Sequence, residues 1–180
     1  MKKNLDKPAR KSNRETFSSV VDVGNSHTVL GIFKGDKVVD HWRLTTRKET
    51  TSDEVMNRIG GLVRFSKIKP AEITHVGLST VVPAHERPWI KALQTLLKRP
   101  VQVVSSKNCL GCPIAYPNPA SLGADRLCNI IALRDRGYKD AIVVDMGTAT
   151  TFDVMKDGGF AGGIIIPGIS ASLDVLTEKA

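Results

Sequence analysis

The 180-residue sequence has little of several features that would place a protein in a specialised class. Aromatic residues make up only 5% of the chain, so a core drawn from its 41% hydrophobic residues is mainly aliphatic. No run of about eighteen consecutive apolar residues occurs, which argues against a transmembrane helix. The N-terminus lacks the apolar stretch of a secretory signal, and we therefore expect a cytoplasmic protein without membrane contact.

Cysteine and histidine are also scarce. The three cysteines are Cys109, Cys112 and Cys128, and the four histidines are dispersed. Cys109 and Cys112 have the spacing of a redox or zinc-binding pair, but no second such pair and no nearby histidine completes a zinc site. We therefore expect reduced thiols without a metal.

The net charge of +8 is concentrated at one end of the chain. The first 16 residues hold six Lys or Arg and two Asp or Glu, which is half of the net charge. Almost no apolar residue lies among them, so residues 1–17 are predicted to form a disordered basic tail. No aromatic residue is interleaved with these charges, and we expect no specific nucleic-acid binding.

A strand-turn signature occurs twice. Asp22-Val23-Gly24-Asn25-Ser26-His27-Thr28 follows one short apolar run, and Asp145-Met146-Gly147-Thr148-Ala149-Thr150-Thr151 follows another. Glycine permits a tight turn and lets a phosphate approach the backbone amides, while the hydroxyls donate to phosphate oxygens. A carboxylate at the end of the strand can hold a cation or its water shell. One such turn is common in hairpins, but two matching copies predict a nucleotide held from both sides.

The apolar pattern predicts the same opening order of elements in both halves. In the first half we expect strands at 18–23, 28–34, 38–45, 73–82 and 101–104, a helix begun by the capping box at 51–54, and a second helix opened by Pro88 and Trp89. After a loop that reaches Pro119, a helix is expected at 123–136. Strands at 141–145, 151–155 and 159–166 and a helix from Ser170 complete the second half.

This order predicts an α/β protein with a duplicated ribonuclease-H-like, or actin-like ATPase, fold, in which mixed sheets pack with helices. The first domain is expected at 18–107 and the second at 108–180. The second domain repeats the strand-strand-strand-helix opening of the first and then stops, so we expect it to be incomplete. An uncovered sheet face would follow from that, with the aliphatic run 164–166 partly exposed.

The string between the two turns identifies a family. It reads Tyr116-Pro117-Asn118-Pro119-Ala120-Ser121-Leu122-Gly123-Ala124-Asp125-Arg126, and Gly162-Gly163 and Pro167-Gly168 follow the second turn. Together with the two turns, these motifs resemble type III pantothenate kinase from about Val20 onward. The turns alone would indicate only the superfamily of acetate and sugar kinases, heat-shock ATPases and actin.

The resemblance implies a cytoplasmic homodimer that phosphorylates the 4′-hydroxyl of pantothenate with ATP and Mg²⁺, the first step of coenzyme A synthesis, and that uses K⁺ or NH₄⁺. It implies that Asp125 is the catalytic acid/base and that Asp145 binds the monovalent cation. Asp22 would organise Mg-ATP. The residues implied to line the pantothenate site are Tyr116, Gly123, Ala124, Asp125 and Arg126. Those implied to contact ATP are Asp22, Val23, Gly24, Asn25, Ser26, His27, Thr28, Val29 and Thr148.

The chemistry of the central string agrees with these roles. Asp125 is expected in the first turn of a helix, where the macrodipole favours the charged carboxylate, and a carboxylate of ordinary basicity suffices for phosphoryl transfer. Arg126 can pair with the pantothenate carboxylate as a planar fork. A surface ion pair at a helix start is the alternative interpretation of these two residues. Ser26 and His27 replace a Thr-Asn pair common in the family, but the hydroxyl is kept.

Three other functions remain open from the sequence. A sugar or acyl kinase of the same superfamily would have the two turns but not the Tyr116–Arg126 string. A catalytically inactive fragment would have all the motifs without turnover. An accessory transcription factor, a label given to members of this family, would use the basic tail.

Overall fold

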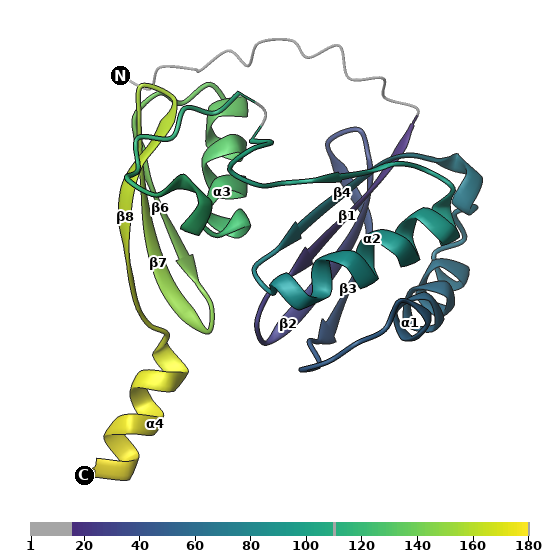
Figure 1. Cartoon of the computed structure of the whole chain (residues 1–180), viewed down its shortest axis with the longest axis horizontal. Helices are drawn as coiled ribbons and strands as arrows, with labels where there is room; N and C mark the ends of the chain where they lie inside the picture. Colours follow the sequence, from purple (N-terminus) through teal and green to yellow (C-terminus); the bar gives the residue numbers. More distant parts are fainter. Residues whose placement is uncertain (1–15, 110, 180) are drawn as a thin grey trace. The chain divides into compact units, whose positions relative to one another are not determined.

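Two compact units, divided between Val104 and Ser105, make up the described part of the chain. The computed structural model describes residues 16–109 and 111–179 (Figure 1). The predicted basic tail lies almost wholly outside these residues. Each unit combines a β-sheet with helices, which confirms the predicted mixed α/β fold class.

The first unit contains a five-stranded mixed sheet with the order β3-β2-β1-β4-β5. Its strands are β1 (Phe17–Val23), β2 (His27–Lys34), β3 (Lys37–Thr45), β4 (Ile73–Thr80) and β5 (Val101–Val103). The first three strands form the predicted antiparallel meander, while β4 pairs parallel with both β1 and β5. This is the arrangement expected for a ribonuclease-H-like unit, and it brings the carboxyl ends of β1 and β4 to one edge.

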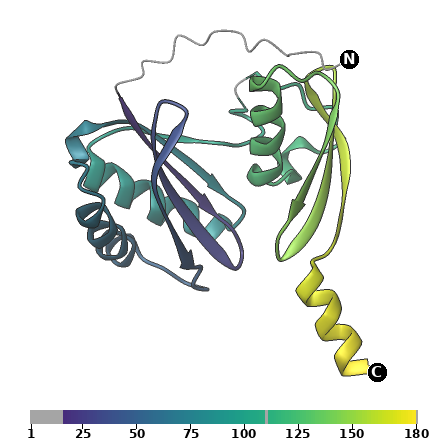
Figure 2. The same cartoon turned by 180° about the vertical axis from the view of Figure 1, so that it is seen from behind.

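Two helices close the core of this unit (Figures 1 and 2). They are α1 (Ser52–Phe65) and α2 (Pro83–Leu97), and a short 3-10 helix, η1 (Pro70–Glu72), precedes β4. Their apolar residues join alternate residues of β1, β2 and β4 in one buried cluster, which includes Val21, Ile59 and Leu93. The core is almost wholly aliphatic, as the composition predicts; Trp89 is its one fully buried aromatic among the described residues.

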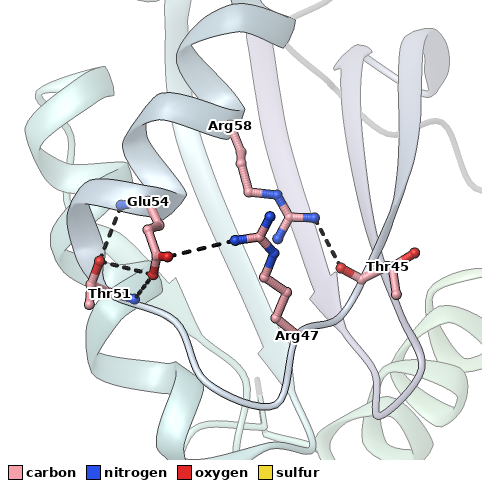
Figure 3. A network of polar contacts seen from close by, with 5 residues as sticks. All are labelled: Thr45, Arg47, Thr51, Glu54 and Arg58. Carbon is pink, nitrogen blue, oxygen red and sulfur yellow. Dashed lines mark hydrogen bonds and ion pairs between the residues drawn. The ribbon is translucent and has the colours of Figure 1, made fainter.

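The start of α1 shows how local sequence fixes a boundary (Figure 3). The Thr51 hydroxyl accepts a hydrogen bond from the Glu54 amide, and the Glu54 carboxylate accepts one from the Thr51 amide at 2.8 Å. Arg47 lies 3.6 Å from the same carboxylate, and Arg58 donates to the carbonyl of Thr45. The predicted capping box is therefore confirmed, and the hydrogen bonds from Thr51 lower the pKa of Glu54.

The start of α2 was predicted wrongly. The helix begins at Pro83, and Pro88 lies inside it. Proline at the first helical position loses no intrahelical bond, whereas Pro88 removes one bond of the ladder. The buried face of α2, which includes Trp89, Ala92 and Leu93, offsets that loss. Strand β4 accordingly ends at Thr80, two residues earlier than predicted.

The second unit repeats the meander in a separate three-stranded antiparallel sheet. Its elements are η2 (Pro119–Ser121), α3 (Ala124–Asp135), β6 (Ala141–Met146), β7 (Ala149–Lys156), β8 (Gly159–Pro167) and α4 (Ile169–Lys179). The loop before α3 is fastened to the sheet, because the amide of Ala115 donates to the carbonyl of Phe160 and the amide of Phe160 donates to that of Pro113. Cys109, Cys112 and Cys128 carry no disulfide, and burial raises the pKa of Cys112.

Candidate active site

The first Asp-x-Gly turn joins β1 to β2. Gly24 closes it by donating its amide to the carbonyl of His27 at 3.0 Å. A Cβ at Gly24 would lie 2.9 Å from that same oxygen, so only glycine fits this turn without a shift. Asp22 is exposed at the end of β1, opposite Val29, whereas the buried Thr28 hydroxyl lies 2.9 Å from that of Thr46.

The second turn joins β6 to β7 and is one residue tighter. Asp145 pairs with Thr151, six residues along, whereas Asp22 pairs with Val29, seven residues along. The amide of Gly147 donates to the carbonyl of Ala149 at 3.0 Å. The two turns therefore match in sequence but not in backbone register.

Gly168 fastens the start of α4 to the second turn. Its amide donates to the carbonyl of Thr148 at 3.1 Å, and a Cβ there would collide with the carbonyls of Gly147 and Thr148. The first turn of α4 is thus held beside the Gly147-Thr148 backbone. A turn with a hydroxyl next to a helix N-terminus is an arrangement suited to phosphate oxygens.

Asp125 lies in the first turn of α3 and is half-buried. Its carboxylate accepts a hydrogen bond from the amide of Arg126 at 2.8 Å. Burial raises the pKa of Asp125, and the negative charges of Asp145 and Asp153 raise it further. The sequence predicted ordinary basicity from the helix dipole; desolvation outweighs that effect, so the carboxylate is more basic than expected.

Arg126 is buried and forms an ion pair that the sequence analysis missed. Its Nε donates to Oδ1 of Asp153 at 2.6 Å. Asp153 comes from β7 and is fully buried. The second carboxylate oxygen of Asp153 lies 3.4 Å from Nδ2 of Asn129, one turn further along α3. The pair fastens the helix start to the sheet.

Aromatic rings and a glycine complete the surroundings of Arg126. The ring of Phe160 lies beneath the guanidinium, 5.2 Å from its central carbon, and the ring of Tyr116 packs edge-on against Phe160. A Cβ at Gly163 would collide with Nη2 of Arg126 and with the carbonyl of Phe152. The second unit therefore brings together Tyr116, Asp125, Arg126 and Asp145 from the predicted set, whereas Asp22 to Val29 belong to the first unit.

The described carboxylates suit partly hydrated cations rather than a closed metal cage. Among the described residues, no group of three or more His, Cys, Asp or Glu gathers as a complete metal cage. Asp125 and Asp145 do interact electrostatically. Mg²⁺ in phosphoryl-transfer sites keeps several waters and is usually held by one or two carboxylates plus substrate phosphates, so an exposed carboxylate such as that of Asp22 can hold it without a complete cage. No described helix has the length and apolarity needed to cross a membrane.

Comparison with known proteins identifies the family. The sequence model of type III pantothenate kinase matches residues 20–180. Type III pantothenate kinases of Desulfosudis oleivorans and Syntrophus aciditrophicus are each 42% identical to this chain, and each alignment covers 89% of this chain and 64% of the relative. This chain therefore spans less than two thirds of the length of these relatives.

Solved structures show the same fold at low sequence identity. A putative 2-dehydro-3-deoxygalactonokinase from Sinorhizobium meliloti has a TM-score of 0.57 at 15% identity, covering 91% of this chain and 57% of its own. A putative Baf family transcriptional activator from Campylobacter jejuni has a TM-score of 0.54 at 17% identity, covering 90% of this chain and 60% of its own. These structures show the fold alone, whereas the family model, matched over residues 20–180, establishes that the chain belongs to the type III pantothenate kinase family.

Proposed function

We propose that a protein containing this chain transfers the γ-phosphoryl group of ATP to the 4′-hydroxyl of pantothenate. The single observation that carries the proposal is the Asp125-Arg126 pair at the start of α3, because it joins a basic carboxylate to a guanidinium beside it. Family membership supplies the substrate.

Asp125 is the group that takes the proton of the attacking hydroxyl. Its raised pKa makes the carboxylate a better proton acceptor, while Asp145 lies close enough to share the charge of a bound cation. Mg²⁺ supplies charge neutralisation on the phosphates when it is bound. The second turn and the start of α4 bind phosphate oxygens through Thr148 and the backbone.

The first turn, Asp22 to Val29, also contacts ATP, with Asp22 organising Mg-ATP. Tyr116, Gly123, Ala124 and Arg126 line the pantothenate site, and Asp145 binds K⁺ or NH₄⁺. The enzyme works as a homodimer in the cytoplasm and has no specific nucleic-acid partner. The tight backbone at Gly24 and at Gly168 supports the two phosphate-binding turns.

The deciding experiment is ATP-dependent phosphorylation of pantothenate by this chain, run beside a version extended to the relatives' length. We expect turnover in the extended version with pantothenate and little with a sugar or with acetate. Turnover with a sugar instead would favour another kinase of the superfamily. Sequence-specific DNA binding without turnover would favour the transcription factor.

A catalytically inactive fragment is the second candidate for the 180-residue chain alone. It is favoured by the large apolar side chains that lie exposed on the second sheet, among them Ile142, Met146 and Ile164. A sheet with one bare apolar face is marginally stable, so we expect weak ATP binding and little or no phosphorylation from this chain. Measurable turnover together with a cooperative unfolding transition that Mg-ATP raises by several degrees would contradict this expectation.

A further inference from the structure

Arg126 has one nitrogen, Nε, that is fixed by an ion pair, and a buried nitrogen, Nη2, that has no hydrogen-bond partner among the described residues. Its Nε donates to Asp153, but Nη2 is buried and makes no hydrogen bond to any described residue. A buried guanidinium N–H without an acceptor is costly, because its desolvation is not compensated. A donor without an acceptor can receive a ligand group, and a carboxylate is the group whose geometry matches a guanidinium best.

We propose that Asp153 is a positioning residue for substrate binding: it holds Arg126 by Nε, so that Nη2 is kept available for the carboxylate of pantothenate. The inference rests on the function proposed above and extends it to a residue that does not itself touch the substrate. Asp153 is fully buried, so any contact with pantothenate passes through Arg126.

Four residues fix the orientation of the guanidinium, two by contact and two indirectly. Asp153 fixes its Nε edge, and Asn129 contacts the second oxygen of that carboxylate. The Phe160 ring supports its face. Gly163 leaves the space that Nη2 occupies, since a Cβ there would overlap it. Helix α3 and strands β7 and β8 thus act together on a single side chain.

Positioning and simple charge predict opposite results for Asp153→Asn. The substitution removes a negative charge next to the binding group, so electrostatics alone would tighten binding of an anionic ligand. If Asp153 acts by orienting Arg126, the loss of its charge-assisted hydrogen bond lets the guanidinium turn, and binding weakens. The sign of the change in pantothenate affinity therefore distinguishes the two.

The experiment uses the version extended to the relatives' length, with Mg²⁺ and a non-hydrolysable ATP analogue, and compares pantothenate with its alcohol analogue, in which CH₂OH replaces the carboxylate. Dissociation constants are measured by calorimetry, and the Arg126 Nε–H resonance is followed by NMR. We expect Asp153→Asn to weaken pantothenate binding about tenfold or more, the usual scale for a hydrogen bond to a charged group. The alcohol analogue should change by less than about twofold, because it has no carboxylate for Arg126 to bind.

Asp157→Asn is the matched control, because Asp157 is an exposed residue of the β7–β8 turn whose φ of 51° suits asparagine. It should leave both affinities unchanged. Asn129→Ala is a milder second variant, for use if Asp153→Asn does not fold. It removes only the contact to the second oxygen and should weaken pantothenate binding severalfold.

Two outcomes would overturn the positioning role and leave the proposed function intact. One is pantothenate binding that stays equal or tightens in Asp153→Asn, and the other is an equal weakening of the affinities for both ligands. If Asp153→Asn does not fold, unchanged pantothenate affinity in Asn129→Ala overturns the role. Failure of the extended wild-type version to bind pantothenate at all would instead reject the proposed function, and the carboxylate ligand with it.

Discussion

The two units of this chain begin with the same meander, yet they bury it differently. In the first, α1 and α2 close a large aliphatic core over β1, β2 and β4. In the second, α3 contributes Leu127 and Ile130 to a smaller set of buried residues with Met155 and Phe160. The other face of that sheet stays bare: Ile142, Val144 and Met146 on β6, and Ile164 and Ile166 on β8, are all exposed.

The comparison shows that burial of a strand is decided by the helices that flank it. Ile164 on β8 is 60% exposed, while Ile32 on β2 is 2% exposed. Both are isoleucines in strands with strong β-propensity, so the strand sequence alone does not set the outcome. The five predictions below test or sharpen this difference between the units.

The largest effect concerns the division of chemistry between the units. In a version extended to the relatives' length, Asp125→Asn should lower kcat by at least about two orders of magnitude with a modest change in the KM for ATP, because it removes the proton acceptor. Asp22→Asn in the first unit should instead raise the KM for Mg-ATP. Steady-state kinetics of both variants check this, and near-normal turnover of Asp125→Asn would refute its role.

Core substitutions should reveal the difference in packing. Leu93→Ala in the first unit leaves a cavity in a fully buried site and should lower the free energy of unfolding by about 2–5 kcal/mol. Ile164→Ala in the second should cost less than about 1 kcal/mol, because the side chain is mostly in water. Urea denaturation measures both, and a cost at Ile164 equal to that at Leu93 would mean that this face is covered in solution.

The bare face should also drive self-association. Ile142→Thr combined with Ile166→Thr keeps β-branched residues but removes apolar surface, so the chain should associate less at high concentration. Val38→Thr on an exposed position of β3 is the control and should change little. Analytical ultracentrifugation over a range of concentrations distinguishes them. Unchanged association in the double variant would show that another surface is responsible.

The two turns should respond to different cations. Activity of the extended version should require K⁺ or NH₄⁺ and fall in Na⁺ alone, and Asp145→Asn should weaken that response. Asp22→Asn should preserve it, because Asp22 is proposed to organise Mg-ATP instead. Titrations of activity with each monovalent salt at constant ionic strength provide the measurement. Activity that does not depend on the monovalent ion would remove this role from Asp145.

The smallest effect is on stability. The folded pKa of Asp125 is raised, so its contribution to stability is present below the unfolded pKa and is lost as the pH rises through the folded pKa. At pH 7 the ionised carboxylate is therefore destabilising, and Asp125→Asn should raise Tm slightly. This gain in Tm should become smaller as the pH is lowered toward about 4. For the same reason, the acid limb of the pH profile of kcat/KM should have its midpoint at a pH above the ordinary aspartate pKa of about 3.9. A lower Tm in the variant at pH 7 would contradict this.

Signals between residues that are close in sequence account for the parts of the fold that were predicted correctly. The capping box at Thr51 and Glu54 lies within one turn of helix, so its hydrogen bonds can be predicted from residues that are close in sequence. The start of α2 is ambiguous in the local sequence, because either Pro83 or Pro88 could open a helix. Only the burial of His85 and Trp89 on one face of α2 decides between the two starts.

Long-range contacts account for what was missed at the site. Asp153 is separated from Arg126 by 27 residues, and an acidic residue in a strand is usually expected to face solvent. One signal was available: Asp153 alternates in phase with Met155, which is buried, so the carboxylate belongs to the inner face. The raised pKa of Asp125 likewise depends on burial and on charges from β6 and β7, which no local pattern reveals.

The glycine at position 163 has a consequence for how this family can vary. Any side chain there would occupy the space of the Arg126 Nη2 and press on the carbonyl of Phe152. A larger residue at 163 is therefore compatible only with a shorter residue at 126 and a shifted strand. Across homologous sequences the two positions should change together or not at all, and a lone substitution at 163 should mark a protein that no longer binds an anionic substrate through α3.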